Sequence, residues 1–280
     1  GLKKIQVASF VNPKRVPGWA DADDVIRGFK AKEGVVYHAL WLNEKGIERA
    51  MQHSDRLTHM GSISTTASET FMKHNTNRGF QINREVQRGQ IQLYKKYGIK
   101  VRRASIMTAF GCNFEGEIAP QLVVDRLKEI LDIADEEGTP IEILSIADTM
   151  GWAAPNSIKQ VVGKVRETWP DQRICLHLHD TRGMGIANVY AGMEMGVDLF
   201  DSSVAGLGGC PFAALKGAAG NVCTEDIVFL CNEHGIETGV NLDALIEVAR
   251  LAEDIVGHPL PGSIMHAGSL TQYKVSQAAE

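Results

Sequence analysis

Short apolar runs alternate with amphipathic stretches along almost the whole chain. The strand-like runs lie at residues 4–10, 34–41, 56–64, 101–110, 141–148, 173–180 and 197–206. Helical patterns lie between them at residues 20–29, 44–53, 83–98, 120–138, 155–169 and 185–196. Many of these helices end in glycine directly before the next strand, which is a common way for a helix to stop. Strands that alternate with helices in this manner predict βαβ units and a parallel sheet.

The number of units favours a barrel over an open, doubly wound sheet. About seven units fit into the 280 residues, and none opens with a GxGxxG fingerprint or a P-loop. A doubly wound sheet of this size would more often carry one of these loops. We therefore expect an α/β chain folded as a (β/α)8 TIM barrel, with the first βα unit absent from this sequence. Because no Pro/Ser-rich linker or low-complexity segment interrupts it, residues 1–280 are expected to form one domain.

Composition narrows the class of protein further. Hydrophobic residues make up 44% and charged residues 22% of the chain, the balance of a globular protein with a core. The net charge of -5 argues against a general nucleic-acid binder, and we interpret the basic segment at 95–103 as a solvated rim. No apolar run of about 18 residues predicts a membrane span, and the chain does not open with a signal peptide. The five cysteines form no CxxC pair, so we expect a reducing compartment, the cytoplasm.

In a barrel, the chemistry takes place where the strands end and the βα loops begin. The polar residues at which the apolar runs stop are therefore candidates, and they bring serine, acid and imidazole to one opening. They are Gln6, Ser9, His38, Ser62, Ser64, residues 112–115, Ser145, Asp148, Thr149, His177, His179, Asp180, Ser202 and Ser203.

Two histidines one residue apart, His177 and His179, give the strongest single signal. Residues i and i+2 of a strand point to the same face, roughly 6.6 Å apart. Such a pair at the end of a strand, followed by an acid, indicates a shared cation, although H-x-H alone is only moderately specific. A third ligand with an oxygen donor would suit Mg or Mn better than zinc. His38 and His59 stand alone, and we interpret them as ordinary core or rim groups.

Cys210 stands out among the cysteines because it follows three glycines in the segment GLGGCPFA. Glycine permits backbone shapes that other residues disfavour, and the place near the last strand favours a reactive or proton-donating thiol. Cys175, Cys223 and Cys231 are interpreted as buried structural cysteines. Cys112 fits either role.

Asn221 and the pair Asp148–Thr149 each allow two interpretations. Asn221 closes the segment GAAGN before an apolar helical run, so it either caps that helix or supplies an oxygen ligand to the cation. Asp148 and Thr149 either cap the next helix or face the substrate. Because they end an apolar strand, we favour the second interpretation for them.

Taken together, these segments resemble the 3-hydroxy-3-methylglutaryl-CoA lyase family of metal-dependent TIM-barrel lyases. The matching segments are VASFVNPKRVP, SETF, FGCNFEG, ADTMG, HLHDTRG followed by AN, DSSVAGLGGCPFA and GAAGNVCTED. The resemblance runs from Ser9 to the GVNL segment, nearly the whole chain. Isopropylmalate and homocitrate synthases share the barrel and the H-x-H but typically continue with Asn-Asp. Here Asp180 and Thr181 follow, as in the lyases.

The resemblance implies a retro-Claisen cleavage, in which a tertiary alcohol loses its proton, a C–C bond breaks and an acyl-CoA enolate leaves. It makes His177, His179 and Asn221 the ligands of a divalent cation, Mg or Mn. It also implies that Cys210 is the active-site thiol, and we expect Cys210, His177 and Asp148 to be catalytic. The expected substrate-binding residues are Ser9, Gln6, Phe114, Ser145 and Thr149. The expected partners are an acyl-CoA substrate and, in a homodimer, a second copy of the chain.

The sequence departs from the family pattern at several positions. The first strand of the family carries an Arg-Asp pair, and this sequence begins after that strand, so we expect it to be part of a longer protein. Gln6 stands where the family has Glu, and Phe114 where it has Tyr. The expected reaction is cleavage of 3-hydroxy-3-methylglutaryl-CoA to acetyl-CoA and acetoacetate, or of a closely similar branched 3-hydroxyacyl-CoA. The alternatives are a lyase for another substrate such as citramalyl-CoA, a condensing synthase, and an inactive or binding paralogue.

Overall fold

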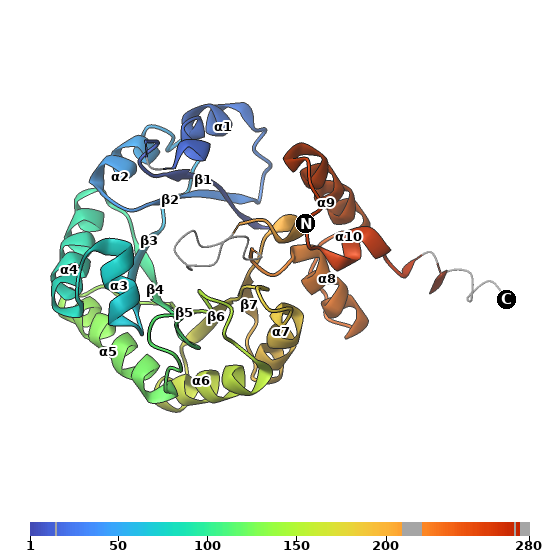
Figure 1. The fold of residues 1–280 in the computed structure, drawn as a ribbon. Coiled ribbons are helices and arrows are strands. Elements are labelled where there is room, and N and C mark those ends of the chain that lie inside the picture. Colours follow the sequence, from blue (N-terminus) through green and yellow to red (C-terminus); the bar gives the residue numbers. More distant parts are fainter. Residues whose placement is uncertain (15, 209–219, 272, 275–280) are drawn as a thin grey trace.

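Parallel strands curve around a common axis, and helices cover their outer face (Figure 1). The computed structural model describes residues 1–14, 16–208, 220–271 and 273–274. Within these residues the strands are β1 (Lys4–Phe10), β2 (Val36–Trp41), β3 (Gly61–Thr66), β4 (Val101–Met107), β5 (Ile143–Ala147), β6 (Arg173–His177) and β7 (Leu199–Asp201). β1 pairs with β2, and β3 to β7 pair in chain order, every ladder being parallel. This is the TIM-barrel architecture that the alternating pattern predicts.

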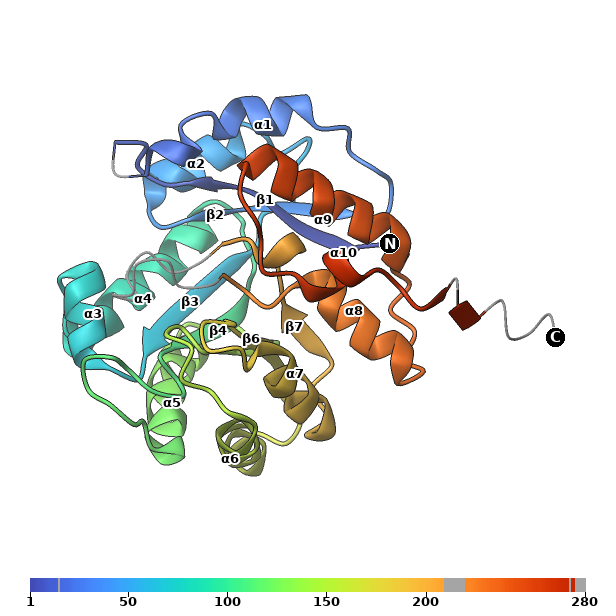
Figure 2. The ribbon, with the colours of Figure 1, turned by 45° about the vertical axis from the view of Figure 1, so that its right-hand side comes forward.

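Helices follow the strands and bury one face against them. They are α1 (Ala22–Gly28), α2 (Glu44–Met51), α3 (Glu69–Thr76), α4 (Phe80–Lys96), α5 (Pro120–Glu136), α6 (Pro155–Thr168), α7 (Gly185–Glu194), α8 (Thr224–Glu233), α9 (Leu242–Val256) and α10 (Ser263–Ala267), with short 3-10 turns η1 (Pro17–Trp19) and η2 (Val204–Gly206). In α5, Val123, Leu127, Ile130 and Ala134 recur every three or four residues, and all are buried. Figure 2 shows α8, α9 and α10 gathered on one side of the barrel. No helix in the described ranges is long and apolar enough to cross a membrane.

The last predicted strand is much shorter than expected. The apolar pattern predicts a strand over residues 197–206, but β7 ends at Asp201. Beyond it, Ala205 adopts a left-handed backbone conformation (φ 55°) and its N–H donates to Glu225 Oε2 at 3.1 Å. The chain therefore leaves the sheet to bond with α8. The pattern also missed α3, whose N-cap Ser68 accepts a hydrogen bond from the Phe71 N–H at 3.0 Å.

Strand alternation separates an apolar outer face from a polar inner face. Ile106 and Ile146 are fully buried within the main hydrophobic cluster between sheet and helices. Their neighbours on the other face are small and polar: Ser105 and Ser145 lie opposite each other across β4 and β5, and Cys175 of β6 lies opposite Ser145. The inside of the barrel is therefore lined with hydroxyl and thiol groups, and larger polar side chains can reach across it.

Candidate active site

The carboxyl ends of β5 and β6 bring the predicted site residues together. β6 ends at His177, and His179 continues as an isolated antiparallel bridge to Asn221. The ring centroids of His177 and His179 are 5.2 Å apart. On the neighbouring strand, the Asp148 N–H donates to the His177 carbonyl at 2.9 Å. The expected pair of imidazoles therefore lies at the mouth of the barrel, although the regular strand stops between them.

The ring of His179 is held by a main-chain carbonyl. Its Nδ1 lies 3.1 Å from the Thr149 carbonyl oxygen. Because a carbonyl oxygen only accepts, Nδ1 carries the proton and the lone pair lies on Nε2. Burial and, to a smaller extent, the neighbouring His177 lower the pKa of His179 to about 4, against the raising effect of the hydrogen bonds with Thr149 and Asn221. The ring is thus neutral at pH 7, the form in which imidazole binds metals.

The ring of His177 is held by a carboxylate. Its Nδ1 lies 3.3 Å from Asp201 Oδ2, and Asp201 also receives the Arg103 guanidinium at 2.8 and 3.2 Å. Burial alone would raise the pKa of Asp201, but the hydrogen bonds from His177 and Arg103 and the charge of Arg103 outweigh burial and hold that pKa well below its usual range. An ionised carboxylate can only accept, so His177 also carries its proton on Nδ1.

Asn221 offers an oxygen that nothing in the described part of the chain satisfies. Its Nδ2 donates to Ser203 Oγ at 2.8 Å and to the Leu207 carbonyl at 3.4 Å. These contacts orient the amide, and Oδ1 is buried without a partner in hydrogen-bond geometry. A buried acceptor left unsatisfied costs about 1–3 kcal/mol, so such an atom calls for a ligand.

Two imidazole nitrogens and one amide oxygen therefore form a donor set that fits a divalent cation. Hydrogen bonds engage the Nδ1 of each ring and leave its Nε2 as the second nitrogen, and the side chain of Asn221 lies beside His179 and raises its pKa. This is the usual arrangement of metal-binding histidines. Within the described ranges, no group of three or more His, Cys, Asp or Glu side chains could hold a metal. The set thus depends on the asparagine oxygen, a mixed N/O environment of the kind that suits Mn²⁺ or Mg²⁺.

Asp148 is the second buried group with an unused oxygen. Its Oδ1 accepts from the Trp152 N–H at 2.7 Å, while Oδ2 is buried without a partner among the described residues. Burial raises the pKa of Asp148 to about 6, against the lowering effect of backbone hydrogen bonds from Ala153 and Trp152. A carboxyl group with such a pKa exchanges protons readily near neutrality.

Thr149 has a structural task that the sequence did not indicate. Its Oγ1 accepts from the Thr108 N–H at 2.9 Å. Thr108 has a φ of 54°, in the left-handed region that a β-branched residue rarely adopts. The contact holds the loop after β4 against the loop after β5, next to the histidines.

The remaining predicted substrate residues are spread around the barrel. Ser9 is buried at the end of β1, and Gln6 is exposed on the same strand opposite His38. Ser145 is buried on the inner face of β5. Phe114 stacks on His74 of α3 with ring centroids 4.7 Å apart. Among the described residues, no hydrogen bond or ring contact joins Gln6 or Phe114 to the histidine pair.

The cysteines divide as the sequence indicates, as far as they can be placed. Cys112, Cys175, Cys223 and Cys231 are buried and form no disulfide. Burial raises the pKa of Cys175 to about 12, so its thiol is inert. Cys112 is buried against Ser68 Oγ at 3.1 Å, which supports the structural interpretation for it. The prediction for Cys210 falls outside the described residues.

Arg103 corrects the interpretation of the basic segment at 95–103. We expected that segment to form a solvated rim, but Arg103 points into the barrel and pairs with Asp201. The missed signal is the alternation along β4, which places Arg103 on the same face as the inward-facing Ser105. His38, across the interior, has its pKa lowered to about 4 by burial and by the charges of Lys4 and Arg103, as for an ordinary neutral core histidine.

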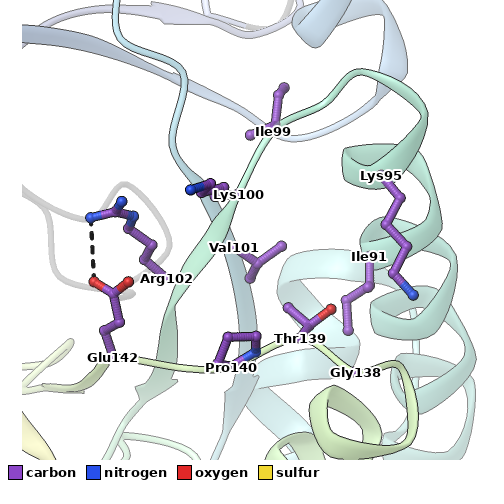
Figure 3. A pocket seen from close by; sticks show the side chains of 10 residues that line it. All are labelled: Ile91, Lys95, Ile99, Lys100, Val101, Arg102, Gly138, Thr139, Pro140 and Glu142. Carbon is purple, nitrogen blue, oxygen red and sulfur yellow. Dashed lines mark hydrogen bonds and ion pairs between the residues drawn. The ribbon is translucent and has the colours of Figure 1, made fainter.

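A cavity of about 360 Å³ lies at the other end of the barrel (Figure 3). It is formed where β4 begins and α5 ends, and Ile91, Lys95, Val101 and Pro140 are among the residues that line it. The histidines follow the carboxyl ends of the strands, so this cavity is remote from them and belongs to a different part of the molecule.

Comparison with known proteins identifies the family to which the chain belongs. The HMGL-like family model matches residues 16–252. The chain is 36% identical over 269 residues to the hydroxymethylglutaryl-CoA lyase YngG of Bacillus subtilis, which covers 93% of this chain and 83% of that protein. It is 37% identical over 247 residues to the mitochondrial hydroxymethylglutaryl-CoA lyase of Mus musculus, covering 88% of this chain and 72% of that protein.

Solved structures agree with these matches. The crystal structure of the HMG-CoA lyase of Bacillus subtilis superposes with a TM-score of 0.84 at 33% identity, covering 95% of this chain and 86% of that chain. An HMG-CoA lyase of Acinetobacter baumannii in complex with coenzyme A and 3-methylmalate gives a TM-score of 0.83 at 34% identity, covering 97% of this chain and 85% of that one. The chain therefore belongs to the HMGL-like family of TIM-barrel lyases.

Proposed function

We propose that this protein is a divalent-metal-dependent lyase that cleaves 3-hydroxy-3-methylglutaryl-CoA to acetyl-CoA and acetoacetate, or cleaves a closely similar branched 3-hydroxyacyl-CoA. The observation that supports the proposal most is the set of three possible donors at the barrel mouth: Nε2 of His177 and Nε2 of His179, whose Nδ1 atoms are already engaged, and the unpartnered Oδ1 of Asn221. The relatives named hydroxymethylglutaryl-CoA lyase, and the one bound to coenzyme A, support the substrate class.

The reaction is a retro-Claisen cleavage. The hydroxyl on C3 loses its proton, the C2–C3 bond breaks, C3 becomes a ketone carbon and the electron pair passes to the thioester enolate. Protonation of the enolate at C2 completes the acyl-CoA product. A bound divalent cation would lower the pKa of the substrate hydroxyl and so favour the first proton transfer.

The protein must supply a base and an acid for these two proton transfers. With Nδ1 donating to Asp201 and Nε2 assigned to the cation, His177 has no free nitrogen left to act as a base. We therefore propose Asp148 as the group that takes the hydroxyl proton, since its Oδ2 is unused and its raised pKa suits the exchange. Cys210 stays the proposed donor to the enolate, on the resemblance alone.

The proposal also includes the substrate-binding residues, the cellular compartment and the oligomeric state. Ser9, Ser145 and Thr149 are proposed to face the acyl group from inside the barrel, and Gln6 and Phe114 to act from its rim. The buried, unpaired cysteines support a reducing compartment such as the cytoplasm. A homodimer is proposed from the resemblance, and sedimentation velocity of the purified protein measures it directly.

An assay on a panel of thioesters tests the proposed reaction. The protein is incubated with Mn²⁺ or Mg²⁺ and with 3-hydroxy-3-methylglutaryl-CoA, citramalyl-CoA or longer-chain 3-hydroxyglutaryl-CoA analogues, and products are identified by mass spectrometry. We expect a ketone-bearing acid and an acyl-CoA in equal amounts, and none after removal of the metal with EDTA. If Mn²⁺ binds and no thioester is cleaved, the protein is a binding paralogue and the proposal is wrong.

A further inference from the structure

An ion pair crosses the inside of the barrel below the two histidines. Arg103 starts from β4 and reaches past β5 and β6 to Asp201, the last residue of β7. Nη1 donates to Oδ2 at 2.8 Å and Nη2 donates to Oδ1 at 3.2 Å, so both carboxylate oxygens are engaged by one planar fork. Such bidentate geometry fixes the carboxylate plane as well as its position.

The same carboxylate contacts the first histidine of the pair. His177 and Asp201 are register partners across β6 and β7. Asp201 Oδ2 accepts from His177 Nδ1 at 3.3 Å as well as from Arg103. The guanidinium makes a second contact, from Nη2 to Cys175 Sγ at 3.3 Å. Cys175 lies two residues before His177 on the same face of β6. The side chain of the histidine is thus supported through two other strands.

The two histidines differ in how replaceable their supports are. The Nδ1 of His179 donates to a main-chain carbonyl, which no substitution removes. The Nδ1 of His177 donates to a side chain, and that side chain is held by another side chain. Only for His177 can the support of the ring be changed while the ring itself is kept.

We propose that Asp201 is a positioning residue, which holds His177 in the Nδ1–H form with its Nε2 directed to the cation, and that Arg103 keeps Asp201 in place for this task. The consequence for cation affinity rests on the proposed metal site. The position of the proton on His177 does not depend on the metal site, because Asp201 contacts His177 within the chain itself. Loss of such an outer partner typically lowers metal affinity about 10- to 100-fold.

The test compares Asp201→Asn with a matched control, Asp198→Asn. Asp198 also accepts a bidentate arginine, with Arg173 Nε at 3.0 Å and Nη2 at 3.1 Å, but it is exposed and contacts no histidine. In the metal-free protein labelled with ¹⁵N-histidine, long-range ¹H–¹⁵N correlation spectra report which ring nitrogen carries the proton. Titration with Mn²⁺, followed by electron paramagnetic resonance of the free ion, gives the affinity.

For Asp201→Asn we expect a population of His177 protonated on Nε2 and a loss of Mn²⁺ affinity of about 10- to 100-fold. An asparagine presents one acceptor oxygen where Arg103 and His177 need two. Asp198→Asn should leave both readouts at the values of the unaltered protein. Arg103→Lys, which keeps the charge but loses the fork, should lower the affinity less than Asp201→Asn and serves as the second variant if Asp201→Asn does not fold.

Two outcomes separate this proposal from the proposed function. If both Asp201→Asn and Arg103→Lys keep His177 entirely in the Nδ1–H form and bind Mn²⁺ within about twofold of the unaltered protein, the positioning role is refuted. If the unaltered protein binds no Mn²⁺ while Asp201→Asn still shifts the proton on His177, the positioning role stands and the metal site is wrong.

Discussion

The two ends of the barrel differ in whether the polar groups described at each end have partners. At the carboxyl end, Asn221 Oδ1 and Asp148 Oδ2 are buried and have no partner among the described residues. At the amino end, around the cavity of about 360 Å³, Lys95 and Arg102 are paired with carboxylates. Lys95 lies 2.9 Å from Glu137. Arg102 lies 3.4 Å from Glu142, as Figure 3 shows.

Unsatisfied buried atoms do not by themselves mark the functional end, because His59 Nδ1 and Gln172 Oε1, which lie just before β3 and β6, are also buried without a partner. The carboxyl end differs because its unused oxygens lie beside the two imidazoles. Exposed ion pairs contribute about 0–1 kcal/mol each, so the charges at the amino end change the free energy of unfolding little. A buried polar atom without a partner costs about 1–3 kcal/mol, and a bound ligand that satisfies the atom removes this cost. The cavity of about 360 Å³ has no unsatisfied buried atom among the residues that line it, so it lacks the feature that marks the histidine pair.

Replacing a proposed ligand should have the largest effect. His179→Ala removes one nitrogen donor, and we expect Mn²⁺ affinity to fall about 1,000-fold, beyond the 10- to 100-fold loss typical of an outer partner. Isothermal titration calorimetry measures the affinity. His38→Ala is the control, because His38 is another inward-facing histidine that lacks the asparagine neighbour. If His38→Ala and His179→Ala lost equal Mn²⁺ affinity, the proposed location of the cation at the carboxyl end would be wrong.

Asp148 should make the stability of the metal-free protein depend on pH. Its pKa of about 6 in the folded chain lies above the ordinary value of 3.8, so the folded state holds its proton longer than the unfolded state does. Stability should therefore fall as the pH rises from about 4 to about 6, by at most about 3 kcal/mol, and stay level above that range. Asp148→Asn should lack this fall.

Guanidinium denaturation of both proteins in EDTA, at several pH values from 4 to 8, measures the difference. The gap between Asp148→Asn and the unaltered protein should widen in favour of the variant as the pH rises from 4 to about 6, and stay constant from there to pH 8. Parallel curves would mean that the folded chain does not perturb this carboxyl group.

Asn221→Ala should separate binding from stability. It removes the unused oxygen, so Mn²⁺ affinity should fall at least about tenfold. The metal-free protein should change by no more than about 1 kcal/mol, since the hydrogen bond to Ser203 is lost and an unsatisfied acceptor disappears with it. Thermal melts in EDTA check the stability. A large loss of stability with unchanged affinity would make Asn221 a structural residue.

The smallest effect is expected at the amino end. Lys95→Ala breaks a partly exposed pair with Glu137 at the edge of the cavity, and it should change stability by less than about 1 kcal/mol. Turnover and Mn²⁺ affinity should stay at the values of the unaltered protein. If either fell tenfold, the two ends of the barrel would be coupled and the contrast drawn between them would be false.

The sequence predicted the features that depend on local pattern. The alternation of apolar runs and helices predicted the barrel, and the spacing of His177 and His179 predicted that their rings would be neighbours. The early end of β7 was missed because a hydrogen bond from Ala205 to Glu225, 20 residues further on, competes with the sheet.

The ion pair that supports His177 could not be predicted from the local sequence pattern. Arg103 and Asp201 are 98 residues apart and meet only because the curvature of the five-stranded sheet brings β4 and β7 to one interior. Nothing near either residue in the sequence shows the pairing. The predicted roles of Cys210, Gln6 and Phe114 stay predictions.

The most direct test of the account is the pulsed electron paramagnetic resonance spectrum of bound Mn²⁺. We predict nitrogen couplings from two histidines in the unaltered protein, reduced to one histidine in His177→Gln or His179→Gln. Bound Mn²⁺ without any nitrogen coupling, or with couplings that survive both substitutions, would contradict the assignment of the cation to this pair.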